Sequence, residues 1–148
     1  MFRTILRPLI RTAQRSMATD ANQGGLSLTF ASPAQSFYKD TKVRQVDIPS
    51  YSGSLGILAN HVPILAVIKP GVVTVFEEDG NTRKIFVAAG TVTMNEDSSL
   101  LVLASEAVDV EDLDVSEAQK NLTAASGQNT AEAQIQAEIN QAILDAAR

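Results

Sequence analysis

The sequence predicts a protein of the β-plus-α class, in which a β-sandwich is followed by a C-terminal antiparallel hairpin of two α-helices. Between residues 26 and 105, short apolar runs alternate with turn-forming residues and no helical pattern separates them, which is typical of a β-sandwich or barrel. From residue 115 onward, apolar residues instead recur every three or four positions, which is the spacing of an amphipathic helix. The 148 residues suffice for one ordinary domain with a small appendage.

The N-terminal segment has the features of a mitochondrial transit peptide. Its only charged residues before Asp20 are arginines at positions 3, 7, 11 and 15, a spacing that puts all four on one face of a helix. An acid-free, arginine-rich start that also carries Ser and Thr is typical of such a peptide. The alternative is a basic surface helix or a nucleic-acid-binding arm. We assign residues 1–21 to the transit peptide, 22–108 to the sandwich and 109–148 to the helical hairpin.

The net charge of the chain bears on its partners. The complete sequence has a net charge of −5, and removal of the arginine-rich segment makes the remainder more acidic still. Nucleic acid and anionic lipid attract basic surfaces, so this acidity argues against both as partners.

The first strands are predicted from alternation. Leu26, Leu28 and Phe30 alternate with Ser27 and Thr29, which is the pattern of a half-buried strand. A second apolar set follows with irregular spacing, and this irregularity suggests a β-bulge; its members are Val43, Val46 and Ile48.

The later strands are predicted from the turns between them. Residues 72–76 and 84–89 flank Asp79-Gly80-Asn81, a strong hairpin signal. Residues 91–94 and 100–104 flank a second cluster of turn-forming residues at 95–98. The region is therefore predicted to be all-β.

Capping residues predict the two helices. Asp114, with Glu117 three positions later, predicts a capping box and a first helix from about residue 115 to residue 126. Asn129 with Glu132 repeats the pattern and predicts a second helix that runs towards the C-terminus. The joint at residues 127–128 is short, so the two helices should be antiparallel.

The second helix carries a predicted apolar stripe. Isoleucines at every fourth position should lie on one face of it, at Ile135, Ile139 and Ile143. Helices of this length are marginal alone in water. We therefore expect the hairpin to dock its apolar faces on each other or on the sandwich.

The composition excludes several classes of protein. With 45% hydrophobic and 20% charged residues, the chain has the make-up of an ordinary globular protein, which excludes a wholly disordered one. The absence of cysteine excludes disulfides and thiolate metal sites. No apolar run reaches the roughly 18 residues of a membrane-spanning helix, so we expect no direct insertion into a bilayer.

The candidate chemistry is equally sparse. His61 is the only histidine, so no imidazole cluster can bind a metal ion, and a lone histidine in a loop is more often structural or contact-forming than catalytic. No glycine-rich segment joins a strand to a helix, as a phosphate-binding loop would. We expect a non-catalytic protein without catalytic residues, cofactor or metal.

One block of sequence carries a specific resemblance. The run Gly53-Ser54-Leu55-Gly56-Ile57-Leu58-Ala59-Asn60-His61-Val62-Pro63, followed by Ile68-Lys69-Pro70-Gly71-Val72-Val73, resembles the signature of the small rotor subunit of F-type ATP synthases. Within it, Gly53 and Gly56 are expected where a β-carbon would be strained. The resemblance extends over nearly all of the chain after the transit segment, and includes Ser32-Pro33, Ala88-Ala89-Gly90 and residues 100–114.

The resemblance implies an architecture and a set of partners. Members of this family, called delta in mitochondria and epsilon in bacteria, have a ten-stranded β-sandwich followed by two helices. The sandwich lies at the foot of the gamma subunit, above the polar loops of the c-ring at the matrix face of the mitochondrial inner membrane. The matching positions that face the c-ring are Ser32, Ser54 and Leu55, with His61 near the same end.

The helical hairpin departs from bacterial members that bind ATP or inhibit hydrolysis. The ATP motif of those members has an arginine where this chain has Glu117, and a carboxylate repels phosphate groups. We therefore expect no ATP binding. Inhibitory bacterial members extend basic helices towards an acidic segment of the catalytic subunits, whereas this hairpin is acidic and would be repelled. We therefore also expect no inhibition of hydrolysis. In mitochondrial members a small extra subunit, called epsilon, packs against this protein, and the hairpin is its expected docking site.

Two rival functions remain at this stage. The first is a free-standing β-sandwich that binds a small ligand or a peptide, with the hairpin as a lid. The second is a cupin-like metalloenzyme, which the single histidine argues against. A rotor subunit should co-purify with gamma and the c-ring, whereas a free-standing binding module should be monomeric.

Overall fold

The computed structural model describes residues 25–125, 127 and 130–147. The segment assigned to the transit peptide lies outside these residues. The described part contains seven strands, a short 3₁₀ helix and two α-helices. In chain order they are β1 (Leu26–Ala31), β2 (Ser36–Ser50), β3 (Gly53–Leu58), β4 (Ile64–Ile68), β5 (Gly71–Glu77), β6 (Thr82–Met94), β7 (Ser99–Asp109), η1 (Val110–Asp112), α1 (Val115–Ala125) and α2 (Ala131–Ala146).

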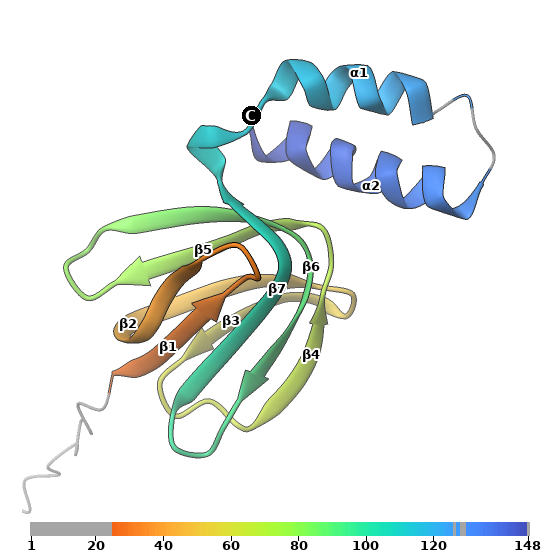
Figure 1. Cartoon of the computed structure of the whole chain (residues 1–148). Coiled ribbons are helices and arrows are strands. Elements are labelled where there is room, and N and C mark those ends of the chain that lie inside the picture. The colour runs from red at the N-terminus through yellow and green to blue at the C-terminus, as the bar shows by residue number, and fades with distance from the viewer. Residues whose placement is uncertain (1–24, 126, 128–129, 148) are drawn as a thin grey trace, which may run out of the picture.

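The strands form a sandwich below a separate helical hairpin (Figure 1). Their order is β1-β7-β6-β4-β2-β3, with β5 paired to both β2 and β6 and an additional pairing of β1 with β2. The pairing of β1 with β7 is parallel, whereas the other pairings among the described strands are antiparallel. The predicted β-sandwich followed by two helices is confirmed.

The expected number of ten strands is not confirmed, because the described residues form seven. The reason is that β2 and β6 are long, with 15 and 13 residues, and each pairs with different neighbours along its length. The first part of β6 pairs with β5 and the last part with β4. The separate strands predicted at 84–89 and 91–94 are therefore one continuous strand.

A glycine lets β6 continue through this change of neighbours. The pairing of β6 with β7 shifts register on both sides of Ala89, which is the bulge of an antiparallel pair. A β-carbon on Gly90 would lie 2.4 Å from the carbonyl oxygen of Leu103. Only glycine allows the two backbones to approach this closely.

The turn predictions agree with the structure at most positions. Turns replace the strands at 79–81 and 95–98, and Gly80 has a positive φ of 86°. The predicted irregularity near Val43 is confirmed as a register shift in the pairing of β2 with β5. The expectation of glycine-specific backbone holds for Gly53, whose φ is 124°, but not for Gly56, which is a regular residue of β3.

The core lies between the layers of the sandwich. Leu26, Leu28 and Phe30 of β1 are completely buried, as their alternation predicts. They join a cluster of buried side chains that come from strands only, with none from the helices. Each fully buried side chain of this size stabilises the fold by roughly 1.5–3 kcal/mol relative to its exposed state. The sandwich therefore has a complete core of its own.

The caps of the helices are partly as predicted. The Oδ1 atom of Asp114 accepts hydrogen bonds from the backbone N–H of Ser116 at 2.9 Å and of Glu117 at 3.1 Å, which confirms the cap of α1. The cap of α2 is Thr130, whose side chain accepts from the N–H of Ala133 at 3.3 Å. The predicted cap, Asn129, is therefore wrong by one position, and that residue lies outside the described part.

The hairpin contacts the sandwich mainly through α2, which lies over β5 and β6 (Figure 1). The seam between α1 and α2 contains the buried residues Ala118, Ala133 and Asn140. The predicted isoleucine stripe meets this seam only in part: Ile135 is 57% exposed, whereas Ile139 and Ile143 are half-buried, and Ile143 lines a groove at the seam with Ala118 and Asn140. Small side chains form the seam because they allow the two helix backbones to approach closely.

Candidate interaction surfaces

Ser32 lies in the turn that joins β1 to β2. Its backbone N–H donates to the carbonyl of Gln35 at 2.8 Å, and its hydroxyl donates to the same carbonyl at 3.1 Å. The preceding residue, Ala31, pairs with Leu103 of β7. These bonds hold the Ser32 turn at a defined level of the sheet.

Ser54 and Leu55 lie at the start of β3, directly after the turn at Gly53. Ser54 is exposed and pairs with Pro49, whereas Leu55 is half-buried and packs against the core. One continuous row of paired residues crosses the sheet. Gly53 pairs with Ser50, Ser50 with Ile68, Ile68 with Gly90, and Gly90 with Ala104. Ala104 follows Leu103, which pairs with Ala31, the residue before Ser32. The structure therefore brings Ser32 and Ser54 to the same level of the strands.

His61 lies at the other end. It follows β3 in the turn before β4, and the N–H of the preceding Asn60 donates to the hydroxyl of Ser98, the last residue before β7. Ala104 lies six positions after Ser98 along the chain, which corresponds to about 20 Å along a strand. The expectation that His61 lies near Ser54 is therefore wrong, since β3 carries the chain from one end of the sandwich to the other.

The His61 side chain has an ordinary structural environment. The ring is half-buried, and its Nδ1 atom is 2.8 Å from the carbonyl oxygen of Val62. No carboxylate shares a hydrogen bond with it among the described residues. The ring therefore lacks a partner of the kind that a catalytic base needs.

An exposed apolar strip begins beside the His61 turn. Val62 is 67% exposed, Leu65 is 76% exposed and Val67 is 55% exposed. Leu103 of β7 extends the strip, since both it and Val67 pair with Thr91 of β6. We call these four residues the β4 strip. Thr91 lies between Val67 and Leu103. Exposed apolar side chains gathered on one face in this way mark contact surfaces.

The β4 strip could not be recognised in the sequence. Residues 64–68 are apolar at every position, so their pattern does not show that one face is exposed. Only the strand pairing reveals that Leu65 and Val67 point away from the core, on the face opposite to the buried Ile68.

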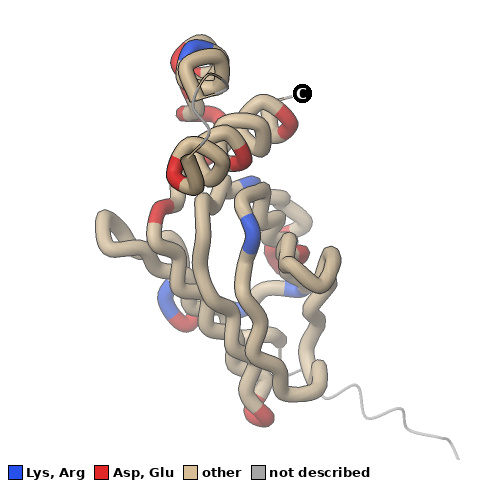
Figure 2. The backbone as a smooth tube through the Cα atoms, turned by 90° about the vertical axis from the view of Figure 1, so that its right-hand side faces the viewer, with Lys and Arg blue, Asp and Glu red and all other residues tan. Residues whose placement is uncertain are grey.

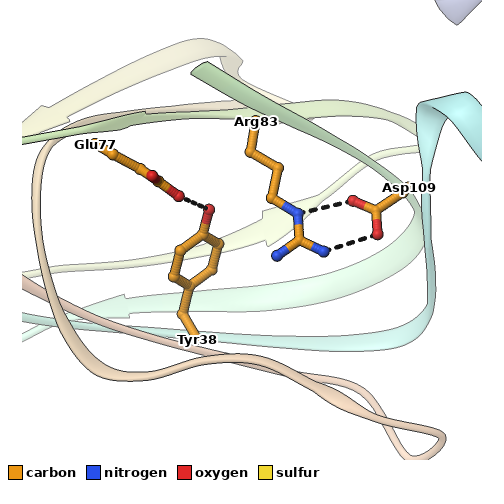
Figure 3. Close-up of polar contacts among 4 residues, drawn as sticks. All are labelled: Tyr38, Glu77, Arg83 and Asp109. Carbon is orange, nitrogen blue, oxygen red and sulfur yellow. Dashed lines mark hydrogen bonds and ion pairs between the residues drawn. The ribbon is translucent and has the colours of Figure 1, made fainter. Parts of the chain in front are cut away.

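A polar cluster lies where the sandwich leads into the hairpin (Figure 3). Arg83 donates from Nε and Nη2 to the two carboxylate oxygens of Asp109 at 2.9 and 2.8 Å. Asp109 is the last residue of β7, so this bidentate pair fixes the direction in which the chain leaves the sheet. The Arg83 guanidinium also lies over the rings of Phe37 and Tyr38, 5.5 and 5.7 Å from their centroids.

The cluster shifts the protonation of two of its members. The Tyr38 hydroxyl donates to Oε1 of Glu77 at 2.7 Å. Burial, followed by this hydrogen bond, raises the pKa of Tyr38 to about 12. The hydrogen bonds to Asp109 raise the pKa of Arg83 above its ordinary value. These residues were missed in the sequence because they come from four separate strands.

Two open grooves follow the seam of the hairpin. The larger, of about 410 Å³, runs between the facing ends of α1 and α2, and the smaller, of about 200 Å³, lies near Asp114. Carboxylates of Glu132, Asp114 and Glu117 border them, and no lysine or arginine is among their lining residues. Neither groove therefore offers a positive charge to a phosphate group.

Acidic residues are distributed along both helices of the hairpin (Figure 2). Lys120 is the only basic residue in the described part of α1 and α2, against the acids Glu117, Glu132, Glu138 and Asp145. No helix of the described residues is long and apolar enough to cross a membrane. Nor does the described part contain three or more acidic or histidine side chains grouped so that they could hold a metal ion.

Residues 25–110 match the family described as "ATP synthase, Delta/Epsilon chain, beta-sandwich domain", which is the whole sandwich and the first residue after it. The chain belongs to this delta/epsilon family. The helical hairpin lies beyond the matched residues.

Relatives of the delta/epsilon chain extend the similarity over the hairpin. "ATP synthase subunit delta, mitochondrial" of Caenorhabditis elegans is 44% identical over 91% of this chain and 87% of its own length. The proteins of the same name from Yarrowia lipolytica and Saccharomyces cerevisiae are 44% and 40% identical, over 93% and 90% of this chain and 89% and 88% of their own lengths. A chain from the cryo-EM structure of the Euglena gracilis mitochondrial ATP synthase shares the fold, with a TM-score of 0.78 at 22% identity, over 84% of this chain and 82% of that one.

Proposed function

We propose that this chain is a non-catalytic rotor subunit of the mitochondrial proton-translocating ATP synthase, located at the matrix face of the inner membrane. It couples rotation of the c-ring to the gamma subunit and hence to ATP synthesis. The observation that carries the proposal is the 44% identity to mitochondrial delta subunits over about nine-tenths of the chain. The proposal includes residues 1–21 as a transit peptide, 22–108 as the sandwich and 109–148 as the helical hairpin.

The two ends of the sandwich suit two different partners. Ser32, Ser54 and Leu55 lie at one level of the strands, and we assign this end to the polar loops of the c-ring. His61 lies at the other end, and from its turn the β4 strip runs along one face of the sheet to Leu103, which pairs with the residue before Ser32. We assign the His61 turn and this face to the gamma subunit. An apolar strip fits a lasting contact between two subunits of one complex, because apolar burial is the main favourable term in such association.

The sandwich transmits torque because it is rigid. Its core is a close-packed cluster of side chains that reaches from Leu26 to Ala107, and close-packed interiors deform little. Seven strands tied by backbone hydrogen bonds spread a load over the whole sheet. A loop or a single pair of side chains would yield instead.

The helical hairpin serves as the docking site for the small mitochondrial epsilon subunit. Ile135 of α2 and Val115 of α1 are 57% and 40% exposed, which leaves apolar side chains for such a partner. The hairpin has no ATP site and requires no cofactor, since the grooves along its seam are bordered by carboxylates. Titration with ATP in a calorimeter should give no heat of binding at micromolar concentrations, and measurable binding would contradict this part of the proposal.

Cysteine crosslinking tests the assignment of the two ends. The chain has no cysteine of its own, so each introduced thiol reports on one position. A cysteine at the exposed Ser54 should crosslink to the c-ring, and a cysteine at the exposed Val62 should crosslink to gamma. The two variants are matched controls for each other, because both lie in or beside turns of the same strand, β3. Exchange of the two partners would contradict the assignment.

Co-purification tests the proposal against its rival. The rival is a free-standing sandwich that binds a small ligand or a peptide beneath a helical lid. A rotor subunit should stay with gamma and the c-ring after extraction in mild detergent. Recovery of the chain as a monomer, with a complete ATP synthase that lacks it, would support the rival.

A further inference from the structure

Two turns that are far apart in the sequence are hydrogen-bonded to each other at the end of the sandwich opposite Ser54. One lies between β3 and β4 and contains Asn60 and His61, and the other, between β6 and β7, ends at Ser98. The backbone N–H of Asn60 donates to Ser98 Oγ at 3.0 Å, and Ser98 Oγ donates to Asn60 Oδ1 at 3.2 Å. We call these two bonds the turn brace.

The brace joins backbone that is unfavourable on its own. Asn60 has a φ of 60° and Ser98 a φ of 62°, so both are in the left-handed region, which strains a residue with a β-carbon. Ser98 is only 8% exposed, so its hydroxyl would lose solvation without gaining a bond if Asn60 moved away. The brace therefore favours one conformation of both turns.

Ser98 is itself anchored to the sheet. Its carbonyl accepts the N–H of Ser27 at 3.0 Å, which ties the turn to β1. The N–H of Asn95 donates to the carbonyl of Ser99 at 2.9 Å and closes the same turn. The brace thus connects the turn that contains His61 to a part of the sandwich that is held by several bonds.

The turn that the brace holds presents exposed apolar side chains. Val62 follows His61 directly and is 67% exposed, and Leu65 begins the outward face of β4 at 76% exposure. A mobile turn would lose conformational freedom when a partner covered these side chains, and that loss weakens binding. A turn already held in one conformation loses less.

We propose that Asn60 and Ser98 are positioning residues for partner binding. The turn brace holds the turn at His61 in the conformation in which Val62 and the rest of the β4 strip contact the gamma subunit. This inference rests on the proposed function, because it takes gamma as the partner of this end. Ser98 acts from the interior and contacts the partner only through the turn.

The test uses the full chain and its gamma subunit. Ser98→Ala removes both bonds of the brace. We expect hydrogen exchange of the Asn60 amide to become faster and the affinity for gamma to fall by about tenfold, the factor that corresponds to one net hydrogen bond. The matched control is Ser99→Ala, because the Ser99 hydroxyl bonds to Asp97 and Asn95 of its own turn and not to the turn that contains Asn60. The control should leave the affinity unchanged.

Two variants of Asn60, the other residue of the turn brace, distinguish an effect on the position of the turn from an effect on folding. Asn60→Gly accepts the left-handed backbone readily but lacks the acceptor for Ser98, so we expect weaker binding at an unchanged fold. Asn60→Asp keeps an acceptor oxygen at the same place and should retain most of the affinity. These variants keep the proposal testable even where Ser98→Ala lowers the thermal stability.

The outcomes distinguish this inference from the proposed function. Faster exchange at the turn with unchanged affinity in Ser98→Ala and Asn60→Gly would show that the brace does not serve binding, while the proposed function would stand. Unchanged exchange in both variants would show that the brace does not hold the turn. Failure of the unmodified chain to bind gamma would overturn the proposed function and this inference together.

Discussion

At Gly90 the backbone of β7 leaves no room for a β-carbon. The β6–β7 bulge brings the backbones so close that a β-carbon here would meet the Leu103 carbonyl at 2.4 Å and the Cα atom of Ala104 at 3.0 Å. Both are backbone atoms, so neither can move aside without disturbing the pairing. The sequence shows a glycine here but not the reason for it, because the bulge depends on the register with β7.

We expect Gly90→Ala to destabilise the sandwich by about 1–3 kcal/mol, the usual cost of forcing an extra methyl group into a packed site. Chemical denaturation of the purified variant measures this as a lower midpoint. Gly56→Ala is the matched control, because its β-carbon would meet only side-chain atoms, Asp47 Oδ1 at 3.2 Å and Gln45 Nε2 at 3.6 Å, and these can shift. Equal losses in the two variants would contradict the explanation.

The Tyr38 hydroxyl gives the fold a dependence on alkaline pH. Its pKa is raised to about 12 by burial and the bond to Glu77, compared with an ordinary value of about 10 in the unfolded chain. Because the folded state holds the proton more tightly, this contribution to stability is complete below pH 10 and is lost as the pH rises through 12. The free energy of unfolding should therefore fall in this window.

Thermal unfolding checks this expectation over about pH 9 to 12, which includes the unfolded and folded pKa values of Tyr38. The melting temperature of the unmodified chain should fall more steeply with pH than that of Tyr38→Phe, which has no proton to lose. The exposed Tyr51, at 67% exposure, provides the control variant Tyr51→Phe. A pH profile of Tyr38→Phe that matches the unmodified chain would exclude Tyr38 as the source.

At the scale of elements, α1 depends strongly on its first turn. The helix has 11 residues and one buried side chain, Ala118, so little packing supports it. Asp114 supplies what the helix lacks, since its carboxylate accepts two backbone N–H groups that would otherwise have no partner. Its hydrogen bonds from the Ser116 hydroxyl and then from the backbone of Glu117 lower the pKa of this carboxyl below its ordinary value.

The lowered pKa makes the helix sensitive to acid. A carboxyl whose pKa is lower in the folded state contributes stability above its unfolded pKa of about 3.9, and the contribution is lost as the pH falls through the folded value. We expect helical circular dichroism to decrease on acidification below about pH 4. Asp114→Ala should show reduced helicity at neutral pH and a weaker acid dependence.

The neighbouring acid Asp112 offers the control for this experiment. It is exposed and belongs to the 3₁₀ turn before the helix. Asp112→Ala removes the same charge without removing the cap. A loss of helicity in Asp112→Ala as large as that in Asp114→Ala would assign the effect to charge alone.

The sequence predicts those strands, turns and caps whose formation depends on residues close together in the chain. Alternation located β1, and the turn at Gly80 located the β5–β6 hairpin, since both depend on residues within a few positions. The cap of α1 was found for the same reason, whereas Thr130 was missed because Asn129 has an equally suitable side chain one position earlier. The continuity of β6 was missed because Gly90 looks like a break until its partner strand is known.

At the scale of the whole molecule, the sandwich has a buried core of its own and the described part of the hairpin does not share it. The buried core cluster contains residues from β1 to β7 and none from α1 or α2. The helices contact each other and, more lightly, β5 and β6. The sandwich should therefore fold without the hairpin, whereas the hairpin alone is too short for stable helices in water.

A chain that ends at residue 112 tests this division. It keeps the Arg83–Asp109 pair and should unfold in one cooperative transition, with a midpoint close to that of the full chain. The isolated peptide 113–148 should show little helix by circular dichroism. Aggregation of the shortened chain, or a stable helical peptide, would show that the core is shared between the two parts.

The order of residues sufficed for the β-sandwich, the helical hairpin, the cap at Asp114 and the family, because each of these is recorded in contacts or motifs within a short stretch of chain. The placement of the surfaces was decided by strand pairing. Ser32 reaches the level of Ser54 through a row of paired strands, and His61 is carried to the opposite end by β3, although it is only seven positions from Ser54. The exposed face of β4 and the bond between Asn60 and Ser98 have no signature in the sequence. The face of β4 is exposed because no other part of the described chain covers Leu65 and Val67. The bond exists because the strand pairing brings together two turns that lie 38 residues apart.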